Sequence, residues 1–106
     1  METEIRFVDV KLKEAFNSIE NFDLRLFKEI NQALDEISRN AYSGIQVKKK
    51  LIPKEFIIKY NINNLWIYNL RKDWRLLYTI ANDEIGVLAI ILNWMDHKDY
   101  EKLFKF

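Results

Sequence analysis

The chain contains no cysteine, a single histidine, a single proline and two glycines. Without cysteine there is no disulfide framework, no thiolate nucleophile and no thiolate metal site, so several functional classes are excluded at once. No stretch approaches the roughly 18 consecutive apolar residues that a membrane-spanning helix requires. The opening sequence METEIRFVDV also lacks the basic and then apolar order of a signal peptide. We therefore expect a cytoplasmic protein without membrane contact.

The 106 residues, 49% of them hydrophobic and 31% charged, suit one domain with one hydrophobic core. We find no internal repeat, low-complexity tract or linker, so a single domain should span residues 1–106.

The net charge of +1 conceals an uneven distribution. Residues 1–36 carry five basic groups against nine acidic ones, whereas residues 37–106 carry twelve against seven. This asymmetry is consistent with one basic face that binds phosphate, and equally with opposite charges that solvate different surfaces.

Apolar residues recur at helical spacing in the first half of the chain, after a short segment that is either a strand or the lead into a helix. The pattern predicts an amphipathic helix over residues 9–20 and a second over residues 23–42. Asn21 or Asp23 can cap the second helix, and Gly44 is placed to end it. The two should form a helical hairpin.

Residues 45–63 are less regular. Pro53 can open a short helix that runs through Tyr60 and ends at a left-handed Asn61, although the run FII, residues 56–58, also fits a strand. We favour the helix.

From Asn64 onward the period changes to that of strands. Branched and aromatic residues fill three segments, 65–70, 74–81 and 86–94, and short polar breaks separate them, which predicts an antiparallel meander. The apolar run from Val87 to Leu92 indicates a strand covered on both faces. Asp96 can cap a last helix through Phe104. The predicted fold is α+β: an N-terminal helical hairpin packed on an antiparallel sheet, with a short C-terminal helix.

Arg75 is the first candidate functional residue. Alternation places it with Leu77 and Thr79, on the sheet face opposite Trp74, Leu76, Tyr78 and Ile80. If Leu76 and Tyr78 face the helices, Arg75 projects from the open face of the sheet. A guanidinium there can bind a phosphate through two parallel hydrogen bonds and stabilise charge that develops on it. The alternative is a structural salt bridge to Asp73 or Asp96.

The strand, polar turn and WRLLY strand between Asn64 and Ile80 resemble the core of the RelE/ParE family of toxin-antitoxin toxins. The terminal cluster DHKDY, residues 96–100, is similar to the cluster with which that family commonly ends. With the helical half included, the resemblance covers roughly residues 5–104. It implies a RelE-like toxin that is neutralised by an antitoxin protein.

The resemblance also implies site residues. Arg75 matches the arginine of the family's catalytic strand, and His97, Lys98 and Tyr100 match terminal residues that lie beside it. Cleavage of RNA by its own 2'-hydroxyl needs a base, an acid and positive charge at the phosphate, and histidine transfers protons well near neutral pH. A lone histidine near a helix start is otherwise more often a capping or surface residue. No metal or other cofactor is expected.

A second set of residues is expected to contact RNA. The lysine run is the densest positive segment and can reach phosphates without reading sequence, although such runs are more often solvated loops. Trp66 and Tyr68 can stack on RNA bases if the strand register places them beside Arg75. In any other register they are core residues. The full set is Lys48, Lys49, Lys50, Lys54, Trp66, Tyr68 and Arg71.

Three functions remain open at this point. The first is an endoribonuclease toxin that cuts mRNA on the ribosome. The second is a ParE-like toxin that inhibits DNA gyrase, and the third is a catalytically silent member of the fold that only binds another protein. Trp66 and Tyr68 stand where the best-known ribosome-dependent RelE enzymes have lysines, and this difference favours the second and third.

Overall fold

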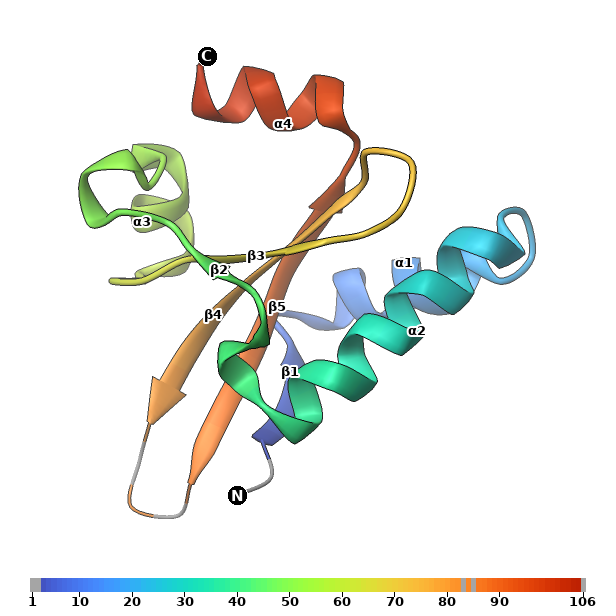
Figure 1. The fold of residues 1–106 in the computed structure, drawn as a ribbon, viewed down its shortest axis with the longest axis horizontal. Helices are drawn as coiled ribbons and strands as arrows, with labels where there is room; N and C mark the ends of the chain where they lie inside the picture. The colour runs from blue at the N-terminus through green and yellow to red at the C-terminus, as the bar shows by residue number, and fades with distance from the viewer. Residues whose placement is uncertain (1–2, 83, 85, 106) are drawn as a thin grey trace.

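The computed structural model describes residues 3–82, 84 and 86–105. In this part of the chain a five-stranded sheet, in the order β1-β5-β4-β3-β2, lies between two helices on each face. Figure 1 shows α1 and α2 together on one side of the strands and α3 and α4 on the other. The α+β prediction is therefore confirmed.

The N-terminal half begins with a strand, β1 (Thr3–Phe7), so the first segment is not a lead into a helix. Helices α1 (Val10–Ile19) and α2 (Leu24–Arg39) form the predicted hairpin. Asp9 caps the first by accepting from the Leu12 backbone N–H at 2.7 Å, and Asp23 caps the second.

The predicted end of the second helix is wrong. Helix α2 stops at Arg39, because Asn40 is extended and its side chain accepts from the Tyr42 N–H to start a 3₁₀ turn, η1 (Ala41–Ser43). Gly44 is not a left-handed cap, since its φ is −82°. The glycine is required for a different reason: a Cβ there would lie 2.6 Å from the Tyr78 hydroxyl oxygen.

The irregular middle segment contains β2 (Ile45–Gln46), a 3₁₀ turn η2 (Lys49–Leu51) and helix α3 (Lys54–Tyr60). The helix follows Pro53 and ends at Asn61, whose φ is 54°. The preference for a helix in this segment is confirmed.

Strands β3 (Trp66–Asn69), β4 (Arg75–Asn82) and β5 (Val87–Met95) form the predicted antiparallel meander. The sheet as a whole is mixed, because β1 pairs in parallel with β5 at one edge while β2 extends the other edge. The paired strands β1 and β5 are distant in sequence, so this contact has no local signal.

Two hydrophobic cores fill the faces of the sheet. The larger lies under the hairpin and includes Ile30, Leu76 and Tyr78, and the smaller lies under α3 and α4 around Phe56 and Leu77. Strand β5 contributes to both, as its continuous apolar run predicts.

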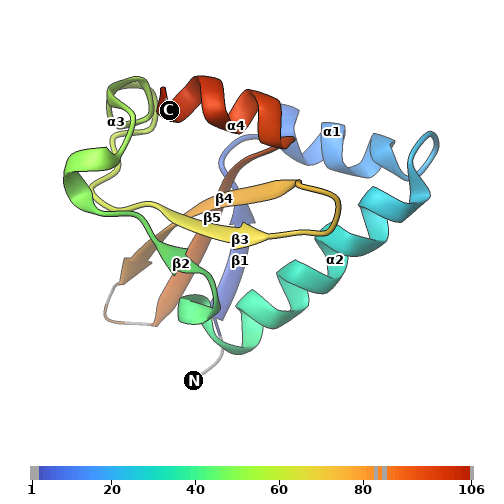
Figure 2. The same cartoon turned by 45° about the horizontal axis from the view of Figure 1, so that its top comes forward.

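The last helix, α4 (His97–Phe104), is capped by Asp96, which accepts from the Asp99 N–H at 2.9 Å. Figure 2 shows this helix lying across the end of the sheet where β5 finishes. Its inner side chains, Tyr100, Leu103 and Phe104, pack onto the smaller core. The face from which Arg75 projects is therefore covered, not open as expected.

Candidate functional site

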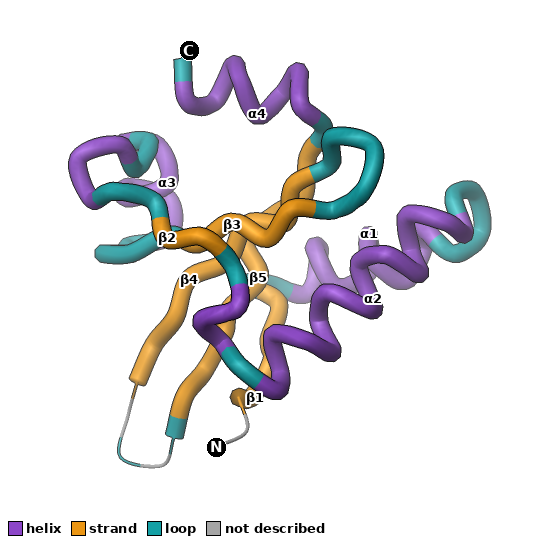
Figure 3. The backbone as a smooth tube through the Cα atoms, in the orientation of Figure 1, coloured by secondary structure: helices purple, strands orange, loops and turns teal. Residues whose placement is uncertain are grey.

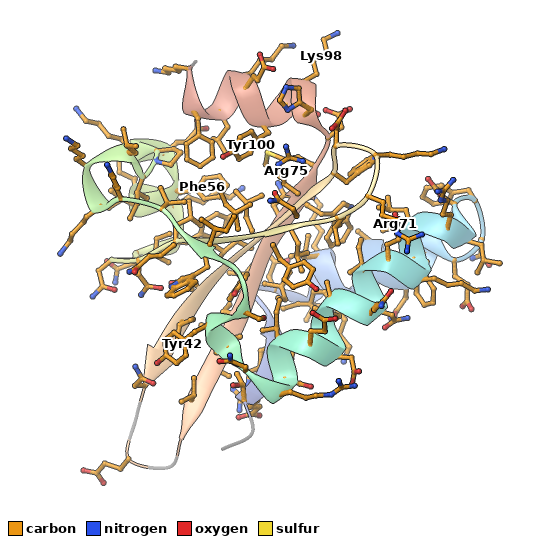
Figure 4. The ribbon with its side chains drawn as sticks, in the orientation of Figure 1. Tyr42, Phe56, Arg71, Arg75, Lys98 and Tyr100 are labelled. Carbon is orange, nitrogen blue, oxygen red and sulfur yellow. The ribbon has the colours of Figure 1, made fainter. Side chains whose placement is uncertain are left out.

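Arg75 is the first residue of β4 and lies opposite Asn69 of β3 and Met95 of β5. Its side chain is half-buried, and its guanidinium carbon lies 5.3 Å from the centroid of the Tyr100 ring. Figure 4 shows the two side chains next to each other beneath α4. This distance is within the range of a cation–π contact.

The guanidinium makes few polar contacts within the described part of the chain. Nη1 donates to the Trp74 carbonyl oxygen at 3.3 Å, and none of the ion pairs found there involves Arg75. The alternative of a salt bridge to Asp73 or Asp96 is therefore not what holds Arg75. A guanidinium has five N–H donors, so the described residues leave most of its capacity for hydrogen bonds to an anion.

Tyr100 is the group that covers Arg75. Its ring packs against Phe104 at 4.7 Å between centroids, and burial raises the pKa of its hydroxyl, while the positive charge of Arg75 acts in the opposite direction. A phenol with a raised pKa keeps its proton at neutral pH, so Tyr100 is a possible proton donor.

His97 is the first residue of α4 and lies three positions, close to one helical turn, before Tyr100. Its Nε2 contacts the Glu101 carboxylate one helical turn later, and its side chain is 49% exposed. A neutral imidazole that donates from Nε2 has Nδ1 as its proton acceptor. The arrangement therefore suits a base at Nδ1, held in one tautomer by a carboxylate.

A pocket of about 690 Å³ opens beside His97, between the outer side of α4 and the β3–β4 turn. Figure 3 shows this turn next to the start of α4. Four lysines, three carboxylates and the histidine line it: Lys72, Asp73, Asp96, His97, Lys98, Glu101, Lys102 and Lys105.

Three of these lysines, Lys72, Lys102 and Lys105, are absent from the candidates that the sequence provides. Lys102 and Lys105 share a helical face with Lys98, and that spacing could have identified them once a helix from Asp96 was assumed. Lys72 could not be identified this way, because only the folded turn brings it to α4. Lys72 and Asp73 both have positive φ there, at 52° and 63°.

Arg75 and Tyr100 are thus in contact at the end of the sheet, while His97 and Lys98 line the pocket beside the same helix. In Figure 4 the Lys98 side chain points away from the sheet.

The register does not place Trp66 and Tyr68 beside Arg75, so the condition for base stacking there is not met. Asn69, not Tyr68, is opposite Arg75, so alternation turns Trp66 and Tyr68 to the other face of the sheet. Trp66 packs there between the rings of Tyr42 and Tyr78. These aromatics are core residues.

Tyr68 also contacts α2, because its hydroxyl donates to the Glu36 carboxylate. Burial, together with the hydrogen bond and the negative charge of Glu36, raises the pKa of Tyr68 to about 12. The ring is therefore tied to the helical hairpin, on the face away from Arg75.

The remaining candidates lie apart from this site. Arg71 is exposed in the β3–β4 turn and lines a small hollow against α2. Figure 4 shows its side chain beside that helix. The four lysines of the run are exposed on η2 and the start of α3, and none lines the pocket beside α4. They are Lys48, Lys49, Lys50 and Lys54.

Among the described residues, no group of three or more His, Asp or Glu side chains is arranged to hold a metal ion. None of the helices described is both long and apolar enough to traverse a bilayer.

The sequence matches no family model and no curated protein. The fold, in contrast, is similar to a solved structure of a YoeB/ParE toxin from Agrobacterium tumefaciens, with a TM-score of 0.62. The similarity covers 90% of this chain and 99% of that one, at 11% sequence identity. At this identity the likeness shows the fold, which is that of the RelE/ParE-type toxins.

Proposed function

We propose, from this toxin fold and from the position of Arg75, that the protein is a metal-independent endoribonuclease toxin. It would cut translated mRNA on the ribosome and be neutralised by an antitoxin. The observation that carries the proposal is a guanidinium that makes one hydrogen bond among the described residues and contacts Tyr100. It lies at the end of the sheet where the pocket beside α4 also opens.

The chemistry is an internal transfer of the phosphoryl group. The 2'-oxygen of the RNA loses its proton to Nδ1 of His97 and attacks the adjacent phosphorus, and the bond from phosphorus to the 5'-oxygen breaks. The leaving 5'-oxygen takes a proton from the Tyr100 hydroxyl. The products are a 2',3'-cyclic phosphate and a 5'-hydroxyl, so the reaction consumes no water and needs no cofactor.

Positive charge supports this reaction at two places. Arg75 would stabilise the negative charge that grows on the phosphate oxygens, as preorganised donors do in other enzymes. Lys98 is a further cation beside His97, and Lys72, Lys102 and Lys105 would hold the flanking phosphates.

A second function is favoured by a different observation. The Tyr100 ring covers a half-buried Arg75, and Trp66 and Tyr68 belong to the core. If Arg75 only fastens α4 to the sheet, the protein is a ParE-like toxin that binds DNA gyrase, or a silent member that binds another protein.

The deciding experiment maps mRNA 5'-ends in a translating extract with the protein, without it, and with Arg75→Ala. New ends that require the wild-type protein, and that carry 5'-hydroxyl groups, are the expected result. A parallel assay measures DNA supercoiling by purified gyrase. Inhibition of gyrase without new RNA ends would replace the ribonuclease with the second function.

A further inference from the structure

The segment from Lys48 to Lys59, which we call the η2–α3 surface, exposes aliphatic side chains that the fold does not use. Leu51 is 51% exposed, Ile57 is 40% exposed and Ile58 is 82% exposed. Phe56 anchors the same helix, because it is 6% exposed and belongs to the smaller core. Ile58 follows it by two positions, about 200° around the helix, and so points to the opposite side.

The same surface is strongly basic. Five lysines lie between positions 48 and 59, against one acidic residue, Glu55. All five are exposed, and within the described part of the chain none takes part in an ion pair. Lys59 lies over the Tyr60 ring at 5.3 Å. Among the described residues, these lysines therefore have no acidic partner to balance their charge.

We propose that the η2–α3 surface is a docking site for an acidic polypeptide segment that carries aliphatic side chains. Aliphatic anchors in the segment would cover Ile58 and Leu51, and its carboxylates would pair with the surrounding lysines. This inference rests on the proposed function in one respect, because a toxin needs a neutralising partner and an antitoxin is the protein expected to supply the segment.

Two other occupants fit the surface less well. RNA would use the lysines, but a phosphate backbone gains nothing from an isoleucine that is exposed on the same surface. A lipid surface would contact both the lysines and the exposed isoleucines. Helix α3, however, has only seven residues and two exposed isoleucines, and this apolar area is small for an interfacial helix. Acidic and aliphatic side chains together match what a polypeptide offers.

The test uses the whole protein and a fluorescent synthetic helical peptide, with leucines at positions i, i+3, i+4 and i+7 and glutamates elsewhere. Two control peptides have serine in place of leucine, or lysine in place of glutamate. Binding is followed by fluorescence anisotropy at low and high salt. Single-stranded RNA and vesicles of phosphatidylserine with phosphatidylcholine are measured in the same way.

We expect the acidic leucine peptide to bind and both control peptides to bind at least about tenfold more weakly. Ile58→Ser should weaken binding about tenfold, since one buried aliphatic side chain has roughly that effect. Replacing Lys48, Lys49 and Lys50 with Gln should weaken it by a similar factor at low salt and by less at high salt.

Matched variants come from another surface of the chain. Val10→Ser removes an aliphatic side chain that is 70% exposed, and replacing the exposed Lys11, Lys13 and Lys28 with Gln removes equal charge. Neither should change binding. All these positions are exposed, so the variants should fold, which circular dichroism and thermal melting would verify.

Three results would overturn the inference: no binding of the acidic leucine peptide, binding unaffected by Ile58→Ser, or binding of RNA or vesicles in its place. The assay contains no ribosome and measures no cleavage. Its failure would therefore leave the ribonuclease proposal intact, and an absence of RNA cleavage would leave the docking site intact.

Discussion

Replacing Arg75 with alanine separates the catalytic role of the guanidinium from its structural one. If Arg75 stabilises the charge that develops on the phosphate, Arg75→Ala should lower RNA cleavage about 100-fold or more, the usual loss when one such donor is removed. A factor of about 100 corresponds to about 2.7 kcal/mol of transition-state stabilisation. This change would be measured as the rate of appearance of new mRNA 5'-ends at fixed protein concentration.

The same substitution also has a cost in stability, because α4 covers Arg75. It removes a partly exposed cation–π contact with Tyr100, with an expected contribution of about 0.5–1 kcal/mol. The loss of packing around the aliphatic stem adds to this. We expect the free energy of unfolding in urea to fall by about 1–2 kcal/mol, which leaves most of a domain of this size folded.

Two further variants make the test specific. Arg75→Lys keeps the charge but not the two parallel donors. Compared with Arg75→Ala, it should regain part of the lost stability but little of the lost cleavage rate. Arg25→Ala, at an exposed position of α2, should leave cleavage and stability unchanged. Cleavage that persists within a factor of a few in a folded Arg75→Ala protein would refute the catalytic assignment, and an effect confined to stability would indicate a fastening role.

His97→Gln should reduce cleavage by a factor comparable to or smaller than that of Arg75→Ala and remove the histidine-dependent limb of the pH–rate profile; an unchanged profile would exclude this imidazole as the base. Replacing Lys102 and Lys105 with Gln should flatten the slope of log affinity for RNA against log salt, measured by filter binding, and an unaltered slope would place the RNA elsewhere. Tyr78→Phe should lower the free energy of unfolding by about 1–3 kcal/mol, because its buried hydroxyl accepts from the Gly44 N–H and donates to a backbone carbonyl; equal stability in urea would show that water replaces it. Gly44→Ala should also destabilise by about 1–3 kcal/mol, since its Cβ would meet that hydroxyl at 2.6 Å, and a normal melting curve would show that the two side chains can move apart.

Local patterns in the sequence determined most elements of this fold. Short-range signals identify elements that the structure contains. They are the caps at Asp23 and Asp96, the left-handed Asn61 and the change of period near Asn64. Alternation along β4 also placed Arg75 on its correct face. These signals act over a few residues, so they can be read before the tertiary contacts are known.

The surroundings of Arg75 depended on contacts that are remote in sequence. The register of β3 against β4 turns Trp66 and Tyr68 away from Arg75, and a shift of one residue would have reversed that result. The return of α4 over the sheet places Tyr100 on the guanidinium. The pocket beside it forms only because the β3–β4 turn brings Lys72 to α4. Each of these contacts is chosen by the packing of a whole face, and the short-range pattern of one segment does not contain that information.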